Sequence, residues 1–457
     1  MLAMGGANLV RGVDTLILEG TGNSYNLGQS KGPNTDLPLF EVTDYRRVLD
    51  FANERWRMEW VRLPRYPTGN TNPRTEVLAV DGGTAFDVVG EGTPRRVADL
   101  QGRIRQAELG HHPVGALQAA VAPDSRVSNR RTIGNLESVD VMTPGGDEFT
   151  LYVDRATKLP EKIQWITYNA NLGDVIAELE FGSYEAVDGL RLPTLLTNYV
   201  DRFKTAEITV SNTVNGETGD LAAPDDVKSA TVPAPRARVE VGEISRGIWY
   251  LTGGSHHSVV VEFADHLTLI EAPQNDIRSL AVIQKARGLN PDKPLTNVIS
   301  THHHFDHSGG IRAAVSEGLT IIAHGASQAF YEDLATRTHS LSPDRLANRP
   351  QPLKLEVVSE KTVLSDNTRT IEIYPIDGSA HADTLLMVYF PAQRLLTFVD
   401  VFTPATPGAT NPPHFPFVAN LMKNVQNYNL RVDRVIPLHG RSVPYSDVRA
   451  AVEAEGQ

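Results

Sequence analysis

Residues 300–310 read STHHHFDHSGG, and this run of histidines and acid decides the fold of the chain around it. An apolar run precedes the stretch and a helical period follows it, which predicts a loop at the C-terminal end of a strand. His302 and His304 stand two residues apart in an extended stretch, so their imidazoles point to one side. Asp306 and His307 fall where the loop turns into the helix and can face a second point. Because crowded imidazoles are costly without a metal and neutral imidazole is a good Zn²⁺ ligand, the spacing predicts a metal site rather than a solvated loop.

Three further residues with metal-binding side chains each stand just past or at the end of an apolar run. They are His381, Asp400 after the run 395–399, and His439 after the run 435–437. Each alone would be an ordinary surface histidine or a turn-capping aspartate. Their joint order, spacing and strand-end placement favour one site built from all of them.

The His302-x-His304-x-Asp306-His307 run, followed by these three residues in this order, resembles the signature of the metallo-β-lactamase superfamily. The resemblance covers residues 239–457 and implies an α+β fold, an αββα sandwich that holds two metal ions. It implies that one metal is bound by His302, His304 and His381, the second by Asp306, His307 and His439, and that Asp400 bridges the two. Zinc is the expected metal, and iron or manganese also suits such nitrogen- and oxygen-rich sites.

The residue type at Asp400 narrows what the resemblance implies. The antibiotic-degrading members typically have Cys or Ser here, whereas Asp is typical of the hydroxyacylglutathione hydrolases, the lactonases and the tRNA-processing nucleases. A carboxylate between two divalent cations stabilises the pair by neutralising charge. We therefore expect a binuclear hydrolase whose metal-bridging hydroxide cleaves an ester, lactone or thioester of a small molecule, with Asp306 as the catalytic residue that directs the hydroxide.

Other functions fit parts of this pattern. Related sites can open strained amides, so β-lactamase-like hydrolysis is an alternative. An oxidative member with a single iron is disfavoured because every second-metal position is filled. The chain could instead be a lipid- or partner-binding protein with a vestigial metal domain, and the complete ligand set argues against this. The sequence leaves the exact substrate and the oligomeric state open.

Composition excludes several classes of protein. The 457 residues include 43 Lys+Arg against 55 Asp+Glu, a net charge of −12. This acidic balance, with no basic cluster beside the metal motif, argues against a nucleic-acid partner. The absence of cysteine excludes a disulfide framework, a thiolate metal site and a cysteine nucleophile. No apolar run approaches the ~20 residues that span a bilayer.

A change in the pattern of polar and apolar residues along the chain predicts two domains. Residues 1–220 contain runs such as 55–60 (RWRMEW) that alternate polar and apolar side chains, which indicates an antiparallel β domain of accessory role. Residues 221–238 contain three prolines and no apolar period, which predicts a linker. Residues 239–457 alternate strands with helices and form the expected catalytic domain.

The N-terminal half resembles, more faintly, the curved antiparallel sheets of periplasmic lipoprotein-carrier proteins. Residues 152–160 (YVDRATKLP) and 184–193 (YEAVDGLRLP) carry this likeness, and both are framework sequence without chemistry. Acyl binding is therefore not carried over to this chain. The likeness favours a periplasmic, exported protein over a cytoplasmic one. Its leader would be absent from this chain, because the first residues lack the basic and apolar regions of a signal peptide.

Histidines outside the signature are not expected to bind metal. His256 and His257 precede a strand, and we expect a solvated turn there, with a substrate contact by one of them as the alternative. His111 and His112 have no partners nearby in the sequence and are expected on the surface. Residues 404–417, rich in proline and aromatics, predict a lid over the pocket, with an ordinary surface loop as the alternative.

Overall fold

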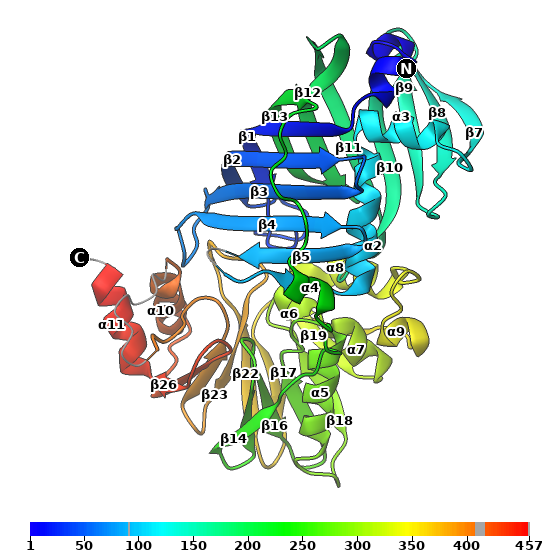
Figure 1. The fold of residues 1–457 in the computed structure, drawn as a ribbon. Coiled ribbons are helices and arrows are strands. Elements are labelled where there is room, and N and C mark those ends of the chain that lie inside the picture. The colour runs from blue at the N-terminus through cyan, green and yellow to red at the C-terminus, as the bar shows by residue number, and fades with distance from the viewer. Residues whose placement is uncertain (90–91, 407–415, 456–457) are drawn as a thin grey trace.

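The computed structural model describes residues 1–89, 92–406 and 416–455, and Figure 1 shows an N-terminal sheet above a two-sheet C-terminal domain. The N-terminal sheet has 13 strands in the order β6-β5-β4-β3-β2-β1-β13-β12-β11-β10-β9-β8-β7, with antiparallel neighbours throughout. Its strands are β1 Thr15–Tyr25, β2 Leu39–Asp50, β3 Arg55–Pro64, β4 Arg74–Asp81, β5 Thr84–Val89, β6 Arg95–Arg96, β7 Arg126–Ile133, β8 Leu136–Met142, β9 Glu148–Asp154, β10 Pro160–Asn169, β11 Gly173–Val187, β12 Leu190–Val200 and β13 Phe203–Val214. The predicted curved antiparallel sheet is confirmed.

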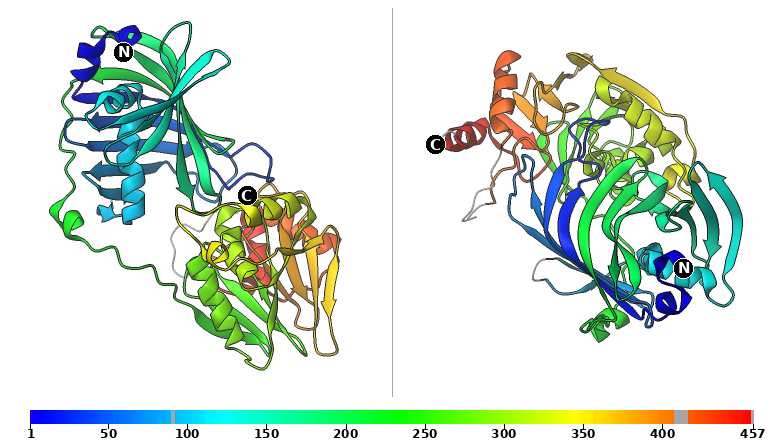
Figure 2. Two further views of the ribbon diagram at one scale, coloured as in Figure 1. Left: turned by 90° about the vertical axis from the view of Figure 1, so that its right-hand side faces the viewer. Right: turned by 90° about the horizontal axis from the view of Figure 1, so that it is seen from above.

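This sheet curls around the helices α2 (Asp99–Ala107) and α3 (Pro113–Val121), with the short α1 (Ala7–Arg11) beside them (Figure 2). Glycine permits the close strand approach at β1, because a Cβ on Gly20 would lie 1.9 Å from a carbonyl oxygen of β13. The pairing of β1 with β2 also shifts register between Gly20 and Gly22, and such bulges bend a strand. Val114 of α3 therefore packs in one core with strands from both halves of the sheet.

His111 and His112, expected on the surface, are instead buried in this core, at 5% and 3% exposure. The His111 ring stacks on Trp165 with centroids 3.8 Å apart. The His112 Nδ1 accepts a hydrogen bond from the Val114 amide and so caps α3. Burial, with a smaller contribution from the Arg47 cation, lowers the pKa of both histidines to about 3. The expectation was wrong because the two histidines are buried by the curvature of the sheet, which the sequence next to them does not indicate.

We expect the free energy of unfolding to fall as pH drops below 6.5. Below that pH both histidines are protonated in the unfolded chain, whereas in the folded chain their buried rings stay neutral down to about pH 3. Each histidine can contribute up to about 1.4 kcal/mol per pH unit. Urea unfolding followed by far-UV circular dichroism at pH 7, 6 and 5 measures this slope. His111→Phe should keep the stacking and make the slope shallower. Equal slopes in His111→Phe and wild type would contradict the prediction.

The C-terminal domain contains two sheets, one of seven strands in the order β14-β15-β16-β17-β18-β19-β20 and one of six in the order β21-β22-β23-β24-β25-β26. The seven are β14 Glu240–Ser245, β15 Ile248–Thr252, β16 Ser258–Glu262, β17 Leu267–Ile270, β18 Leu295–Ile299, β19 Thr320–His324 and β20 Lys354–Val358. The six are β21 Thr362–Ser365, β22 Thr370–Pro375, β23 Leu386–Phe390, β24 Leu395–Phe398, β25 Arg434–Pro437 and β26 Val443–Pro444.

Helices cover the outer faces of both sheets, so the predicted αββα sandwich is confirmed (Figure 1). On the seven-stranded sheet lie α5 Asp276–Arg287, α7 Ile311–Ser316, α8 Gln328–Thr336 and α9 Arg345–Asn348, and on the six-stranded sheet α10 Val418–Asn427 and α11 Tyr445–Glu455. The one-turn helix α6 (Phe305–Ser308) lies between β18 and α7. The parallel run from β17 to β20 ends its strands on one edge, where the loops that follow can meet. No helix of the described residues is long and apolar enough to cross a membrane.

The predicted linker runs beside the N-terminal sheet and contains one short helix, α4 (Asp225–Ser229) (Figure 2). It is tied to that sheet, because the Ala223 amide donates to the Asp81 carboxylate at 2.9 Å and Lys228 forms an ion pair with the same carboxylate at 3.0 Å. Val227 of α4 is buried. The segment is therefore anchored along part of its length.

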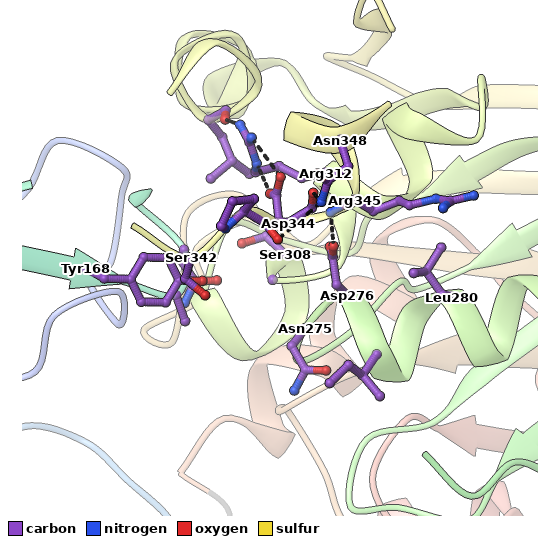
Figure 3. Close-up of a pocket in the computed structure, with 16 residues that line it drawn as sticks. Tyr168, Asn275, Asp276, Leu280, Ser308, Arg312, Ser342, Asp344, Arg345 and Asn348 are labelled. Atoms are coloured by element: carbon purple, nitrogen blue, oxygen red, sulfur yellow. Dashed lines mark hydrogen bonds and ion pairs between the residues drawn. The ribbon is translucent and has the colours of Figure 1, made fainter. Parts of the chain in front are cut away.

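A segment after α8 joins the two parts of the molecule. The Asp174 carboxylate at the start of β11 accepts hydrogen bonds from the amides of Ser340 and Leu341, at 2.8 and 3.1 Å. Beside this contact lies a cavity of about 410 Å³, where Tyr168 of β10 faces residues of the C-terminal domain (Figure 3). Four charged residues line it: Arg312 is ion-paired with Asp344, Asp276 accepts a hydrogen bond from the Arg345 amide, and the Arg345 side chain pairs with Glu317. The cavity is thus part of a charge-balanced contact between the two parts.

Candidate metal centre

The seven predicted ligands come together at one edge of the sandwich, each from a loop at the end of a strand or from α6. The first two follow β18, two lie in α6, and the others follow β22, β24 and β25; in chain order they are His302, His304, Asp306, His307, His381, Asp400 and His439. All of them except Asp306 fall into two groups around the carboxylate of Asp400, and His256 joins the second group.

The first group consists of His302, His304, His381 and Asp400, whose ligand atoms all lie within 4.8 Å of one another. The Asp400 Oδ2 is 3.4 Å from the His302 Nε2 and 3.1 Å from the His381 Nε2. His302 and His304 are each 1% exposed. Four ligand atoms at this spacing are able to hold one metal ion.

The second group consists of His256, His307 and His439, whose nitrogens also lie within 4.8 Å of one another. Asp400 reaches this group too, since its Oδ2 is 3.0 Å from the His307 Nε2 and its Oδ1 is 2.9 Å from the His439 Nε2. Its backbone has a φ of 60°, a left-handed conformation that costs free energy in a residue with a side chain. The fold thus places the carboxylate of Asp400 between two sets of imidazoles, at the cost of an unfavourable backbone conformation at this residue.

Asp306 lies at the rim of the second group, outside the set of nitrogens that define it. Its Oδ2 is 3.2 Å from the His256 Nε2 and 3.6 Å from the His307 Nε2. Its Oδ1 accepts a hydrogen bond from the Gln29 Nε2 at 2.7 Å. Burial opposes ionisation, but His256 and His307 hold the pKa of Asp306 well below its ordinary value. Asp306 therefore stays a carboxylate that faces the cavity.

Sequence reasoning missed His256, which was expected in a solvated turn. Its side chain is only 14% exposed, and its ring centroid lies 4.4 Å from that of His439 and 4.8 Å from that of His307. The available signal was a histidine pair directly before β16, but an irregular turn gives no periodicity from which to orient a ring. His257 points elsewhere, into a hydrogen bond with the Tyr250 hydroxyl at 2.6 Å.

The protonation states of the first group fit a divalent metal. Burial, with repulsion from neighbouring imidazoles, holds the pKa of His302 and of His304 well below the ordinary value, so both rings are neutral. The His302 Nε2 and the His304 Nδ1 are buried and have no hydrogen-bond partner among the described residues. The outer His304 nitrogen, Nε2, donates to the Ser30 carbonyl at 2.8 Å, which turns Nδ1 toward the centre. Unpaired, neutral, inward-facing nitrogens are the form in which imidazole binds metals.

The second group and Asp400 form the charged part of the centre. Burial opposes protonation of His307, but the carboxylates of Asp400, Asp306 and Glu271 raise its pKa to about 10. Burial likewise opposes ionisation of Asp400, yet His307 and His381 hold its pKa well below the usual value. An imidazolium thus supplies positive charge beside the Asp400 carboxylate, at a position where a divalent cation would serve the same purpose.

A loop from the N-terminal part of the chain supports the centre. Besides the Gln29 and Ser30 contacts, the Gly28 carbonyl accepts a hydrogen bond from the Phe305 amide at 3.1 Å. Gly28 has a φ of 82°, and a Cβ there would lie 2.3 Å from the Phe305 ring, so only glycine fits. The Lys31 carbonyl accepts from the Asp383 amide at 2.7 Å. The N-terminal half, expected to be accessory, thus forms hydrogen bonds that hold the loop of the candidate ligands His304 and Asp306 in place.

The centre opens into a cavity of about 730 Å³ lined by both parts of the chain. His256, Asp306, His381, Asp400 and Phe417 line it from the C-terminal domain, and Asn26, Gln29, Tyr66 and Arg74 are among its N-terminal residues. The volume falls in the range of sites for small molecules. Residues 407–415 of the predicted lid lie outside the described residues, and Phe417 at its end lines the cavity.

The family model of the metallo-beta-lactamase superfamily matches residues 251–439. The C-terminal domain belongs to this superfamily. The matched range contains His256 and all seven predicted ligands of the metallo-β-lactamase domain.

Solved structures similar to this chain include several metallo-β-lactamases. One from Pontibacter korlensis is 18% identical, with 48% of this chain and 100% of that chain covered and a TM-score of 0.37. The enzyme FIM-1 from Pseudomonas aeruginosa, in its mono-zinc form, is 18% identical over 48% of this chain and 96% of that chain, with a TM-score of 0.37. A third, from Hirschia baltica, is 17% identical over 47% and 96%, with a TM-score of 0.35.

Zinc should stabilise the metallo-β-lactamase domain against heat, because it binds the folded chain at nitrogens that are otherwise buried without partners. Free zinc at 100 times its dissociation constant contributes about 2.7 kcal/mol per site. Differential scanning calorimetry with zinc and then with excess chelator measures the shift in midpoint. Asp400→Asn should lose most of the shift, and His266→Asn, outside the centre, should keep it. An equal shift in Asp400→Asn and wild type would show that zinc binds elsewhere.

Gln29→Ala should weaken metal binding although Gln29 lies outside the metallo-β-lactamase domain. Without the 2.7 Å hydrogen bond, the Oδ1 of Asp306 loses the partner that orients it, and loss of such outer contacts costs roughly 10- to 100-fold in metal affinity. Competition with a chromophoric chelator measures the affinity. Gln106→Ala is the matched control, because Gln106 of α2 bonds to the backbone of Gly83 and Glu54, both within the N-terminal part of the chain. Unchanged affinity in Gln29→Ala would mean that Asp306 is held by the other contacts alone.

Proposed function

We propose that this protein is a binuclear, metal-dependent hydrolase that cleaves an ester, lactone or thioester of a small molecule. The observation that carries the proposal is the position of the Asp400 carboxylate, within 3.4 Å of imidazole nitrogens from both groups. A single metal would need only one group. Because the Asp400 carboxylate lies between two sets of imidazole nitrogens, the arrangement suits two cations that lie close together and share this carboxylate.

The residues divide between two metal positions. His302, His304 and His381 would hold one metal. His307 and His439 would hold the second together with Asp306, whose Oδ2 lies 3.6 Å from the His307 Nε2, and Asp400 would contact both. Two zinc ions suit this nitrogen- and oxygen-rich set, and iron or manganese are the alternatives. When bound, such a pair lowers the pKa of water toward 7 and polarises a carbonyl oxygen.

The side chains of the chain then direct this chemistry. Asp306 stays ionised and faces the cavity, so it can accept a hydrogen bond from the attacking water and fix its direction. His256 and Gln29 hold the two oxygens of that carboxylate in place. Phe417 and the N-terminal wall enclose the substrate and exclude water from the reacting carbonyl.

The test measures the metal content of the protein and its activity on a panel of substrates. Protein purified without an affinity tag should contain about two metal ions per chain by mass spectrometry, and should hydrolyse a member of an ester, lactone and thioester panel. Asp306→Asn should lower kcat by roughly 10²- to 10⁴-fold, since an amide oxygen lacks the charge and basicity with which a carboxylate takes up the water proton. His266→Asn should leave kcat unchanged.

Four outcomes would overturn this proposal. Turnover that persists in excess chelator, or in Asp306→Asn, would place the activity outside this centre. Hydrolysis of a cephalosporin with no ester, lactone or thioester turnover would favour β-lactamase-like chemistry. A single tightly bound metal would contradict the binuclear arrangement.

A further inference from the structure

The cavity at the metal centre has a second wall, which comes from the N-terminal sheet. Tyr66 follows β3, Arg74 begins β4, and Asn26 and Gln29 follow β1. The described N-terminal residues that line the cavity include no carboxylate. This wall therefore offers hydrogen-bond donors and one full positive charge to whatever occupies the cavity.

Arg74 carries that charge and forms no ion pair with any residue of the described ranges. Its cross-strand neighbour Arg62 is already paired with Glu76, at 2.5 Å, and Arg65 donates to Glu41 at 2.8 Å. The Arg74 Nε is buried and lacks a hydrogen-bond partner among the described residues. A half-buried cation without a counterion is costly, and a bound anion would remove that cost.

The guanidinium is held in place although it lacks an acidic partner. It lies over the Phe40 ring, 5.2 Å from the centroid, and such cation–π contacts orient arginine. The Tyr66 ring packs edge-on against the same Phe40 at 5.3 Å, and its hydroxyl accepts a hydrogen bond from the Asn26 amide at 3.4 Å. Arg74 and Tyr66 thus share one rigid aromatic support.

We propose that Arg74 binds a carboxylate of the substrate, so that the hydrolysed ester, lactone or thioester carries an acidic group at the end remote from the scissile carbonyl. The inference rests on the proposed function, because it assigns the substrate class of the same cavity. One planar guanidinium matches the two oxygens of a carboxylate in a forked pair. Arg74 contacts the substrate away from the reacting atoms and determines specificity.

The experiment compares charged and neutral esters that share a leaving group. The 4-nitrophenyl hydrogen esters of succinate, glutarate and adipate are tested beside 4-nitrophenyl butyrate. Wild type should prefer one of the charged esters. Arg74→Gln should lower kcat/KM for that ester by about 10- to 100-fold, mainly through KM, which is the effect of one charge-assisted hydrogen bond. Its kcat/KM for the butyrate ester should stay within about twofold.

Two variants control for fold and for long-range charge. Arg74→Lys keeps the charge without the fork and should recover part of the preference, which a merely structural role would not require. Arg65→Gln removes the same charge from an exposed, ion-paired site on the same sheet and should keep the full preference. Equal preference in wild type and Arg74→Gln, with hydrolysis intact, would overturn the role of Arg74 and leave the proposed function standing.

A binding measurement separates the two proposals if no ester is hydrolysed. Calorimetric titration of the zinc-loaded protein with glutarate and with butyrate compares a dicarboxylate with a monocarboxylate. Tighter binding of glutarate that is lost in Arg74→Gln would support the carboxylate site while the hydrolase proposal fails. Equal binding of both acids by wild type and Arg74→Gln would overturn the site as well.

Discussion

The candidate metal centre is organised around one half-buried carboxylate, that of Asp400. Asp400 stands in a left-handed backbone conformation between two sets of imidazoles, with nitrogens of both sets within 3.4 Å of its oxygens. Bringing several histidines together without water is unfavourable unless a negative charge or a metal compensates. The ends of β18, β24 and β25 must therefore meet at one edge, and the two-sheet sandwich supplies that edge.

The N-terminal sheet takes part in this centre through backbone as well as side chains. The Ser30 carbonyl fixes the tautomer of His304, and Gly28 makes room for Phe305 at a distance that no larger residue permits. A carbonyl acceptor of this kind raises the basicity of a ligating imidazole. Because the same loop reaches Asp306 through Gln29, both proposed metal positions depend on the contact between the two parts.

The sequence was sufficient for the residues whose placement follows from period and strand ends. His302, His304 and Asp306 could be assigned because an apolar run and a helical period bracket them. Alternating strands and helices predicted a layered domain, and the resemblance to the metallo-β-lactamase superfamily implied the sandwich. Residues placed by irregular or distant structure could not. His256 sits in a turn without periodicity, and the Gln29–Asp306 hydrogen bond joins residues 277 positions apart. His111 is buried by the curl of the sheet, which no local pattern records.

The hydrogen bond from His304 to the Ser30 carbonyl makes ligand strength a function of domain orientation. A small rotation of the N-terminal sheet would lengthen this bond and the Gln29–Asp306 bond together, so the electron density on the inward nitrogen and the aim of the carboxylate would change in step. The linker, anchored at Asp81, limits such rotation. The contact between the two halves thus orients His304 and Asp306 together, which a fold with all of its ligand supports in one domain would achieve without a second domain.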